Sequence, residues 1–141
     1  MRINVNSELK TPDGKPVWLV PPKLDDEGTV VTEGEPMHLH NVLVQVALSP
    51  STKKLEPRNH VIRYALALGA HKAKDANGGT FNISRKVVQE IETDLCHIFA
   101  PIVGGQALLM MGYTLDDLAE LFDDDLFDEL RAMLGGSPKA S

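Results

Sequence analysis

The chain has 141 residues, of which 43% are hydrophobic and 24% are charged, and its net charge is −6. This length and composition fit one globular domain that can bury a core without disulfide bonds. Cys96 is the single cysteine, so an internal disulfide is excluded, and a lone thiol suits a reducing compartment. Polar residues interrupt the start of the chain and no apolar run is long enough to cross a bilayer, so we expect neither a signal peptide nor a membrane partner.

Charge is distributed unevenly along the chain. The segment 53–86 has eight basic and two acidic residues, whereas 114–134 has eight acidic residues and one base, Arg131. This asymmetry suggests that the acidic segment docks on the basic one, in the same chain or in a second copy. A nucleic-acid partner is not expected, because few aromatic residues lie among the bases and the pI is about 5.3.

The N-terminal part has the pattern of short strands. Ile3 and Val5 alternate with polar residues, and a turn signal at Pro12–Gly14 separates them from the apolar run 17–20, so we expect a β-hairpin. The segment 21–36 contains several prolines, glycines and acids, and is expected to be a loop with one short strand within it.

Helices are expected in the remainder, which makes the fold class α+β: an N-terminal β-hairpin followed by a small bundle of four to five helices. Residues 38–48 have helical spacing, although their β-branched content leaves a strand as an alternative. Further helices are expected from Pro57 to about Leu68, from Arg85 to Phe99 and over 102–111. In the core, we expect Leu95 and Ile98 to be buried against Val61 or Leu66.

The strongest periodic pattern lies at the C-terminus. Thr114 is a candidate N-cap and Gly135 a candidate stop, so we expect a long acidic amphipathic helix between them. The domain organisation follows: one α+β domain over 1–112, the acidic helix over 113–135 and a flexible tail over 136–141.

This acidic helix is the candidate partner-binding site. Its apolar stripe either packs into the core, with the acids facing water, or inserts into a groove of a partner. The candidate partner-binding residues are Leu118, Phe122, Asp123, Asp124, Asp125, Leu126, Phe127 and Leu130.

Three other patterns are compatible with chemistry, but a structural interpretation is preferred for each. His38 and His40 resemble a metal pair but have no further ligands nearby. Cys96 and His97 point in different directions on a helix. The Gly104–Gln106 segment lacks the remaining residues of a phosphate loop and fits close helix packing. We therefore expect no catalytic residue, metal or cofactor.

Four segments together resemble small proteins encoded by tailed bacteriophages and prophages. They are Pro36–Leu48, Arg63–Leu68, Ile83–Val88 and Pro101–Ala107, and the resemblance covers about residues 1–112. It implies a viral origin and a role without catalysis, in the host cytoplasm or the virion. We expect a protein that acts through protein–protein contacts, including self-association, in virion structure or assembly. The alternative is a host-directed inhibitor whose acidic helix occupies a basic groove.

Overall fold

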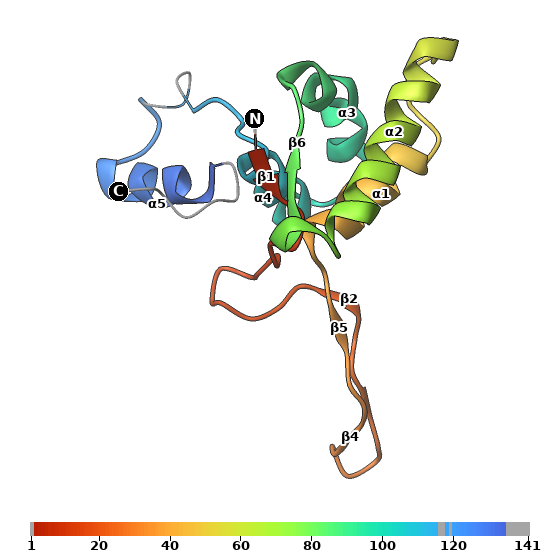
Figure 1. Cartoon of the computed structure of the whole chain (residues 1–141). Coiled ribbons are helices and arrows are strands. Elements are labelled where there is room, and N and C mark those ends of the chain that lie inside the picture. The colour runs from red at the N-terminus through yellow and green to blue at the C-terminus, as the bar shows by residue number, and fades with distance from the viewer. Residues whose placement is uncertain (1, 116–117, 119, 135–141) are drawn as a thin grey trace.

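The computed structural model describes residues 2–115, 118 and 120–134 of the chain. The fold is α+β, as predicted, with short antiparallel strand pairs and five α-helices among the described residues (Figure 1). The strands are β1 (Arg2–Asn4), β2 (Trp18–Val20), β3 (Lys23–Leu24), β4 (Val30–Thr32), β5 (Glu35–Pro36) and β6 (Thr80–Asn82). The helices are α1 (Leu39–Leu48), α2 (Pro57–Ala73), the short 3₁₀ turn η1 (Asn77–Gly79), α3 (Arg85–Ile98), α4 (Pro101–Met110) and α5 (Asp124–Met133).

Helix α1 lies at the centre of the bundle and contacts α2, α3 and α4. It begins at a capping box in which the His38 backbone N–H donates to Asn41 Oδ1 over 2.8 Å. The buried residues Leu39, Val42, Leu43 and Val46 recur at helical spacing, whereas Leu48 at the C-terminal end is exposed. The alternative of a strand over 38–48 is therefore excluded, because the buried residues recur at helical spacing on one face of α1 and not at alternate positions.

Strand β1 does not pair with the apolar run 17–20, so the predicted pairing of the first strand was wrong. It pairs with β6, with Ile3 opposite Phe81, and the Val5 N–H donates to the Gly79 carbonyl over 2.8 Å. The Pro12–Gly14 turn instead closes a tight loop that pairs Lys10 with Pro16. The run 17–20 forms β2 and pairs with β5, with Trp18 opposite Pro36, whereas β6 follows α2 and η1 and pairs with β1.

Helix α2 is longer than predicted and presents a different face to the core. Val61, expected in the core, is 68% exposed, whereas Leu66 is buried together with Arg63. Arg63 turns inward because two carboxylates of α3 lie there, and this rotates Val61 toward solvent. The expected burial of Leu95 on α3 is confirmed.

Helix α5 is shorter than predicted. The expected helix started at Thr114, but Leu115 and residues 120–123 are not helical, and the helix begins at Asp124. The break occurs because Asp123 has extended backbone angles and its carboxylate accepts the Leu126 N–H over 3.0 Å, which makes it the N-cap. The expected stop at Gly135 and the tail 136–141 lie outside the described residues.

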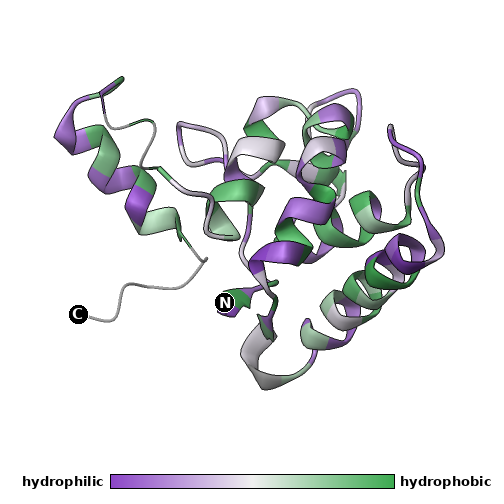
Figure 2. Ribbon diagram, turned by 90° about the horizontal axis from the view of Figure 1, so that it is seen from above, coloured by the Kyte–Doolittle hydropathy of each residue, from purple (hydrophilic) through white to green (hydrophobic). Residues whose placement is uncertain are grey.

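A hydrophobic core joins the bundle to β1, and α5 lies at its edge with alternating apolar and polar residues (Figure 2). Within the part of the chain described, no helix combines the length and apolar character needed to cross a membrane.

Candidate protein-interaction surfaces

The C-terminal segment contains the candidate partner-binding residues, of which some are buried against the domain and others are exposed. Phe127 is only 3% exposed, with the Arg131 guanidinium 5.5 Å from its ring centroid. Helix α5 contacts α4, so one side of the apolar stripe packs against the domain. Leu118 and Leu130 are half-buried. Phe127 therefore packs against the domain and attaches α5 to it, and its role in partner binding stays a prediction.

The other predicted residues face solvent. Phe122 and Leu126 are exposed beside Leu121, which the sequence analysis did not include. Asp124 and Asp125 are exposed in the first turn of α5, where negative charge interacts favourably with the helix dipole. The structure thus leaves an apolar patch at the start of α5 and in the residues before it, bordered by carboxylates.

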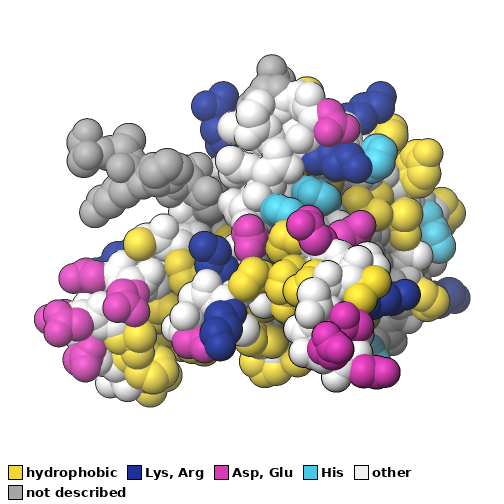
Figure 3. Space-filling model, turned by 90° about the horizontal axis from the view of Figure 1, so that it is seen from below, with side chains coloured by type: hydrophobic (Ala, Val, Ile, Leu, Met, Phe, Trp, Pro, Cys, Tyr) yellow, Lys and Arg dark blue, Asp and Glu magenta, His cyan; other side chains and the backbone are white. Residues whose placement is uncertain are grey.

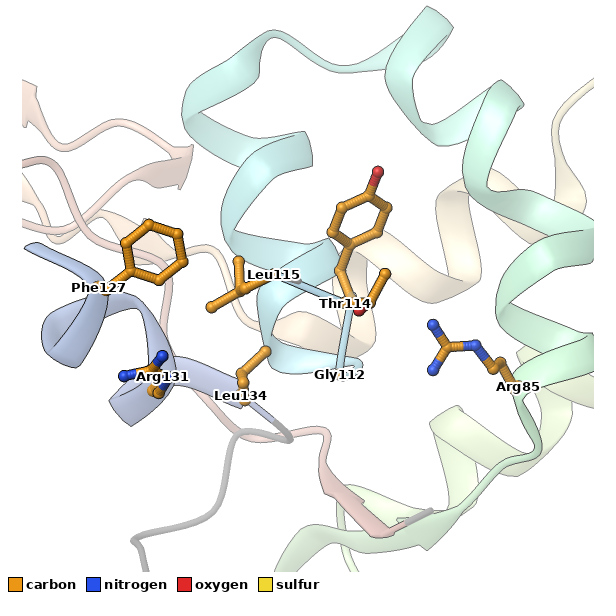
Figure 4. A pocket seen from close by; sticks show the side chains of 8 residues that line it. Arg85, Gly112, Thr114, Leu115, Phe127, Arg131 and Leu134 are labelled. Atoms are coloured by element: carbon orange, nitrogen blue, oxygen red, sulfur yellow. The ribbon is translucent and has the colours of Figure 1, made fainter. Parts of the chain in front are cut away.

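A cavity of about 370 Å³ separates α5 from the body of the domain. Arg85 and Arg131 lie on opposite sides of it, with the apolar Leu115 between them (Figure 4). Arg131 also pairs with Asp128 at 3.3 Å and stacks on Phe127, so its charge is already engaged. Among the described residues, no ion pair joins the acids of α5 to the basic segment 53–86.

A group of exposed apolar side chains lies in a segment where a strand was expected at 17–20 and a loop with one short strand over 21–36. Residues 18–36, here called the arm, form a two-stranded ribbon that extends away from the bundle (Figure 1). The arm exposes six large apolar side chains to between 38% and 67% of their surface: Trp18, Leu19, Val20, Leu24, Val30 and Val31. Strands β2 and β4 agree with the strands expected there, but their pairing with β5 and β3 was not predicted, because runs of two or three residues do not indicate a partner.

The arm is ordered at both ends. At its root, the Leu9 and Met37 backbones both bond to Val17, which ties the arm to the buried N-terminal segment. At its tip, Asp25 Oδ1 accepts the N–H groups of Glu27 and Thr29, each over 2.9 Å. The turn at the tip is therefore held by a local side-chain bond typical of Asx turns.

A buried polar cluster joins α2 to α3. Arg63 donates from Nε to Glu90 Oε2 over 3.0 Å, and its Nη1 lies 2.8 Å from Asp94 Oδ2. Asp94 also accepts the Ser51 hydroxyl and both the N–H and hydroxyl of Thr52. The cluster uses its polar groups to hold the segment after α1 against α3.

Burial alone would raise the pKa of the Asp94 carboxyl, but the hydrogen bonds from Ser51, Thr52 and Arg63 outweigh it and hold that pKa below its ordinary value. The pKa of Glu90 is lowered in the same way, since bonds from Asn59 and Arg63 outweigh its burial. Both carboxylates therefore stay charged and paired with Arg63.

The residues of the other candidate chemistries have separate places. The His38 and His40 rings stack with centroids 5.3 Å apart, and burial followed by the charge of His38 lowers the pKa of His40. Over residues 2–115, 118 and 120–134, no three His, Cys, Asp or Glu side chains are grouped to hold a metal ion. Cys96 is exposed on α3. Gln106 makes two hydrogen bonds to the Lys10 backbone, of 3.0 and 2.7 Å, so it fastens the N-terminal segment to α4.

No protein-family model, curated protein or solved structure matches this chain.

Proposed function

We propose that this protein has no catalytic role and works through protein–protein contacts in the structure or assembly of a virion. The observation that carries the proposal is the arm, which exposes six large apolar side chains on a ribbon away from the bundle. A two-stranded ribbon gains little stability from its own packing. Contiguous exposed apolar surface on a monomer is typical of contact sites.

The polar clusters support the same proposal. Asp94, Glu90 and Gln106 each bond to groups of the fold itself, and the bonds join segments that are far apart in sequence. The burial or position of these side chains is therefore explained by a structural role, because they hold distant segments of the chain together. The virion setting rests on the resemblance of residues 1–112 to small proteins of tailed phages.

The experiment that tests this function is mass analysis of purified virions and of their assembly intermediates. The polypeptide should be present in fixed copy number per particle. A Val30→Ser/Val31→Ser chain should be lost from the particles, because it keeps the fold but lacks the apolar tip of the arm. Absence of the wild-type chain from particles and intermediates alike would overturn the proposal.

A second candidate is a host-directed inhibitor, and one observation favours it. Helix α5 presents exposed Asp124 and Asp125 beside the apolar Phe122 and Leu126, a combination that suits a basic groove with an apolar floor. Expressed alone in the host, the chain would then bind a nucleic-acid-binding protein and compete with its DNA or RNA. Purified wild-type chain that leaves such binding unchanged excludes this candidate.

A further inference from the structure

We infer that the arm of one copy of this chain binds a groove between α1 and α2 of a second copy. The inference rests on the proposed function and names the partner. The groove has a volume of about 630 Å³ and lies between the end of α1, the segment after it and α2. The residues that carry the argument are Leu48, Ser51, Leu55, His60, Arg63 and Tyr64.

The groove, like the arm, exposes large apolar side chains. Leu48 is 59% exposed and Tyr64 is 63% exposed, although both are large hydrophobic side chains. On the outer face of α2, Val61 and Leu68 stand three and four residues from Tyr64, so they extend the same exposed stripe. The apolar side chains of a second chain would remove this surface from water.

The charges of the two surfaces are opposite. The arm has five acidic residues and one lysine, a net charge of −4. On the face of the molecule seen from below, acidic side chains lie beside hydrophobic ones (Figure 3). Helix α2 contains no acidic residue. Beside the groove, Lys53, Lys54 and Arg58 lie just before or at the start of α2, against one acid, Glu56.

The positions of the two surfaces point to a second copy rather than to closure within one chain. The arm joins the bundle at β5, immediately before the start of α1, whereas the groove lies at the end of α1. A helix of ten residues spans about 15 Å, and the arm leads away from the bundle rather than along α1 (Figure 1). A chain therefore presents its arm and its groove at opposite ends of α1.

Both surfaces are held in place before they meet. Asp25 fixes the turn at the tip of the arm. In the groove, Ser51 is held by Asp94 over 2.6 Å, and the same carboxylate positions Arg63. Binding would thus order few side chains, which lowers its entropic cost.

The remaining exposed apolar patch is a poorer partner for the arm. Leu121, Phe122 and Leu126 are bordered by Asp123, Asp124 and Asp125. Contact between this patch and the arm would bring acids against acids, which disfavours association. The groove is flanked by bases instead.

The test is sedimentation velocity of the full chain over a range of concentrations. The wild-type chain should associate, and its association should weaken with added salt because opposite charges are screened. A Val30→Ser/Val31→Ser arm variant and a Tyr64→Glu groove variant should each weaken association by about tenfold or more. Leu121→Ser is the control, because Leu121 is as exposed as Val31 and lies outside both surfaces.

Mixing the two variants distinguishes this contact from others. The arm variant keeps an intact groove and the groove variant keeps an intact arm, so an equimolar mixture should associate more tightly than either variant alone. A wild-type chain that stays monomeric at about 1 mM overturns the inference. So does a mixture that fails to associate, or a Leu121→Ser chain that is weakened equally. These measurements on purified protein leave the virion analysis independent, so the two proposals can fail separately.

Discussion

Arg63 Nη1 lies 2.8 Å from Asp94 Oδ2, and both side chains are almost completely buried. Removing the carboxylate leaves the guanidinium without one of its two charged partners, so we expect Asp94→Ala to cost about 3–5 kcal/mol of unfolding free energy. Urea unfolding measures this cost. Asp128→Ala is the matched control, since Asp128 pairs with Arg131 on the surface and should change stability by about 0–1 kcal/mol. Equal effects of the two substitutions would contradict a structural role for the buried cluster.

The same carboxylate gives a pH dependence. Because the pKa of Asp94 is lower in the folded chain than in the unfolded one, the unfolded chain binds more protons as the pH falls. The stabilisation is therefore complete above the unfolded-state pKa of about 4 and is lost as the pH falls below it. We expect the unfolding free energy to decline below about pH 4. In Asp94→Asn this part of the decline should disappear, and a wild-type profile in that variant would show that other groups cause it.

Two adjacent glycines of α4 should respond differently to alanine. A Cβ at position 104 would lie 3.3 Å from Leu95 Cδ2, whereas a Cβ at position 105 would meet nothing within 4 Å. Gly105→Ala should therefore raise the unfolding free energy by about 1 kcal/mol through helix propensity. Gly104→Ala should gain less or lose stability, because Leu95 must move. Thermal unfolding of the pair decides this, and an equal gain at both positions would refute the close contact.

The N-cap of α5 supplies a prediction about the C-terminal segment. Asp123→Ala removes the side-chain acceptor of the Leu126 N–H and should cost α5 about 1 kcal/mol. Asp124→Ala removes only an interaction with the helix dipole and should cost less. Amide hydrogen exchange in α5 reports the local stability. Faster exchange after Asp124→Ala than after Asp123→Ala would mean that the helix begins elsewhere.

The class of the fold and the existence of α1, α3 and α4 could be predicted from the sequence. Helix α3 was predicted nearly to its ends because Val88, Ile91 and Leu95 repeat at helical spacing on an otherwise polar helix. Such a pattern is local, so it does not depend on what the rest of the chain does. The end of α4 could be predicted for the same reason, because the stop signal is the nearby Gly112, which adopts a positive φ of 81°.

The outer face of α2 could not be predicted, because its orientation depends on distant partners. Arginine is seldom buried without a partner, and the partners of Arg63 lie 27 and 31 residues later, on α3. Alanines and leucines surround the whole helix, so no single apolar face stands out in the sequence. Once Arg63 faces inward, Val61 and Tyr64 face solvent.

Partner binding by the C-terminal residues stays a prediction, although Phe122 and Leu126 are exposed. Two strands of the arm were expected, but their pairing into a projecting ribbon was not. Its strands contain at most three residues each, too few to establish an alternating pattern. The arm and β1 both depend on pairing with strands elsewhere in the chain, and a short strand's own residues do not indicate its partner.

The pairing of β1 with β6 also bears on how the chain folds as it is made. Ile3 faces Phe81, and about 75 residues separate the two strands. During synthesis from the N-terminus, the first strand therefore waits without its partner until α2 and η1 have emerged. Closing so long a loop costs entropy that only later contacts repay, so β1 should dock late and α1 with α2 early. A ribosome-bound fragment that ends before residue 80 would leave Ile3 and Val5 accessible to chaperones.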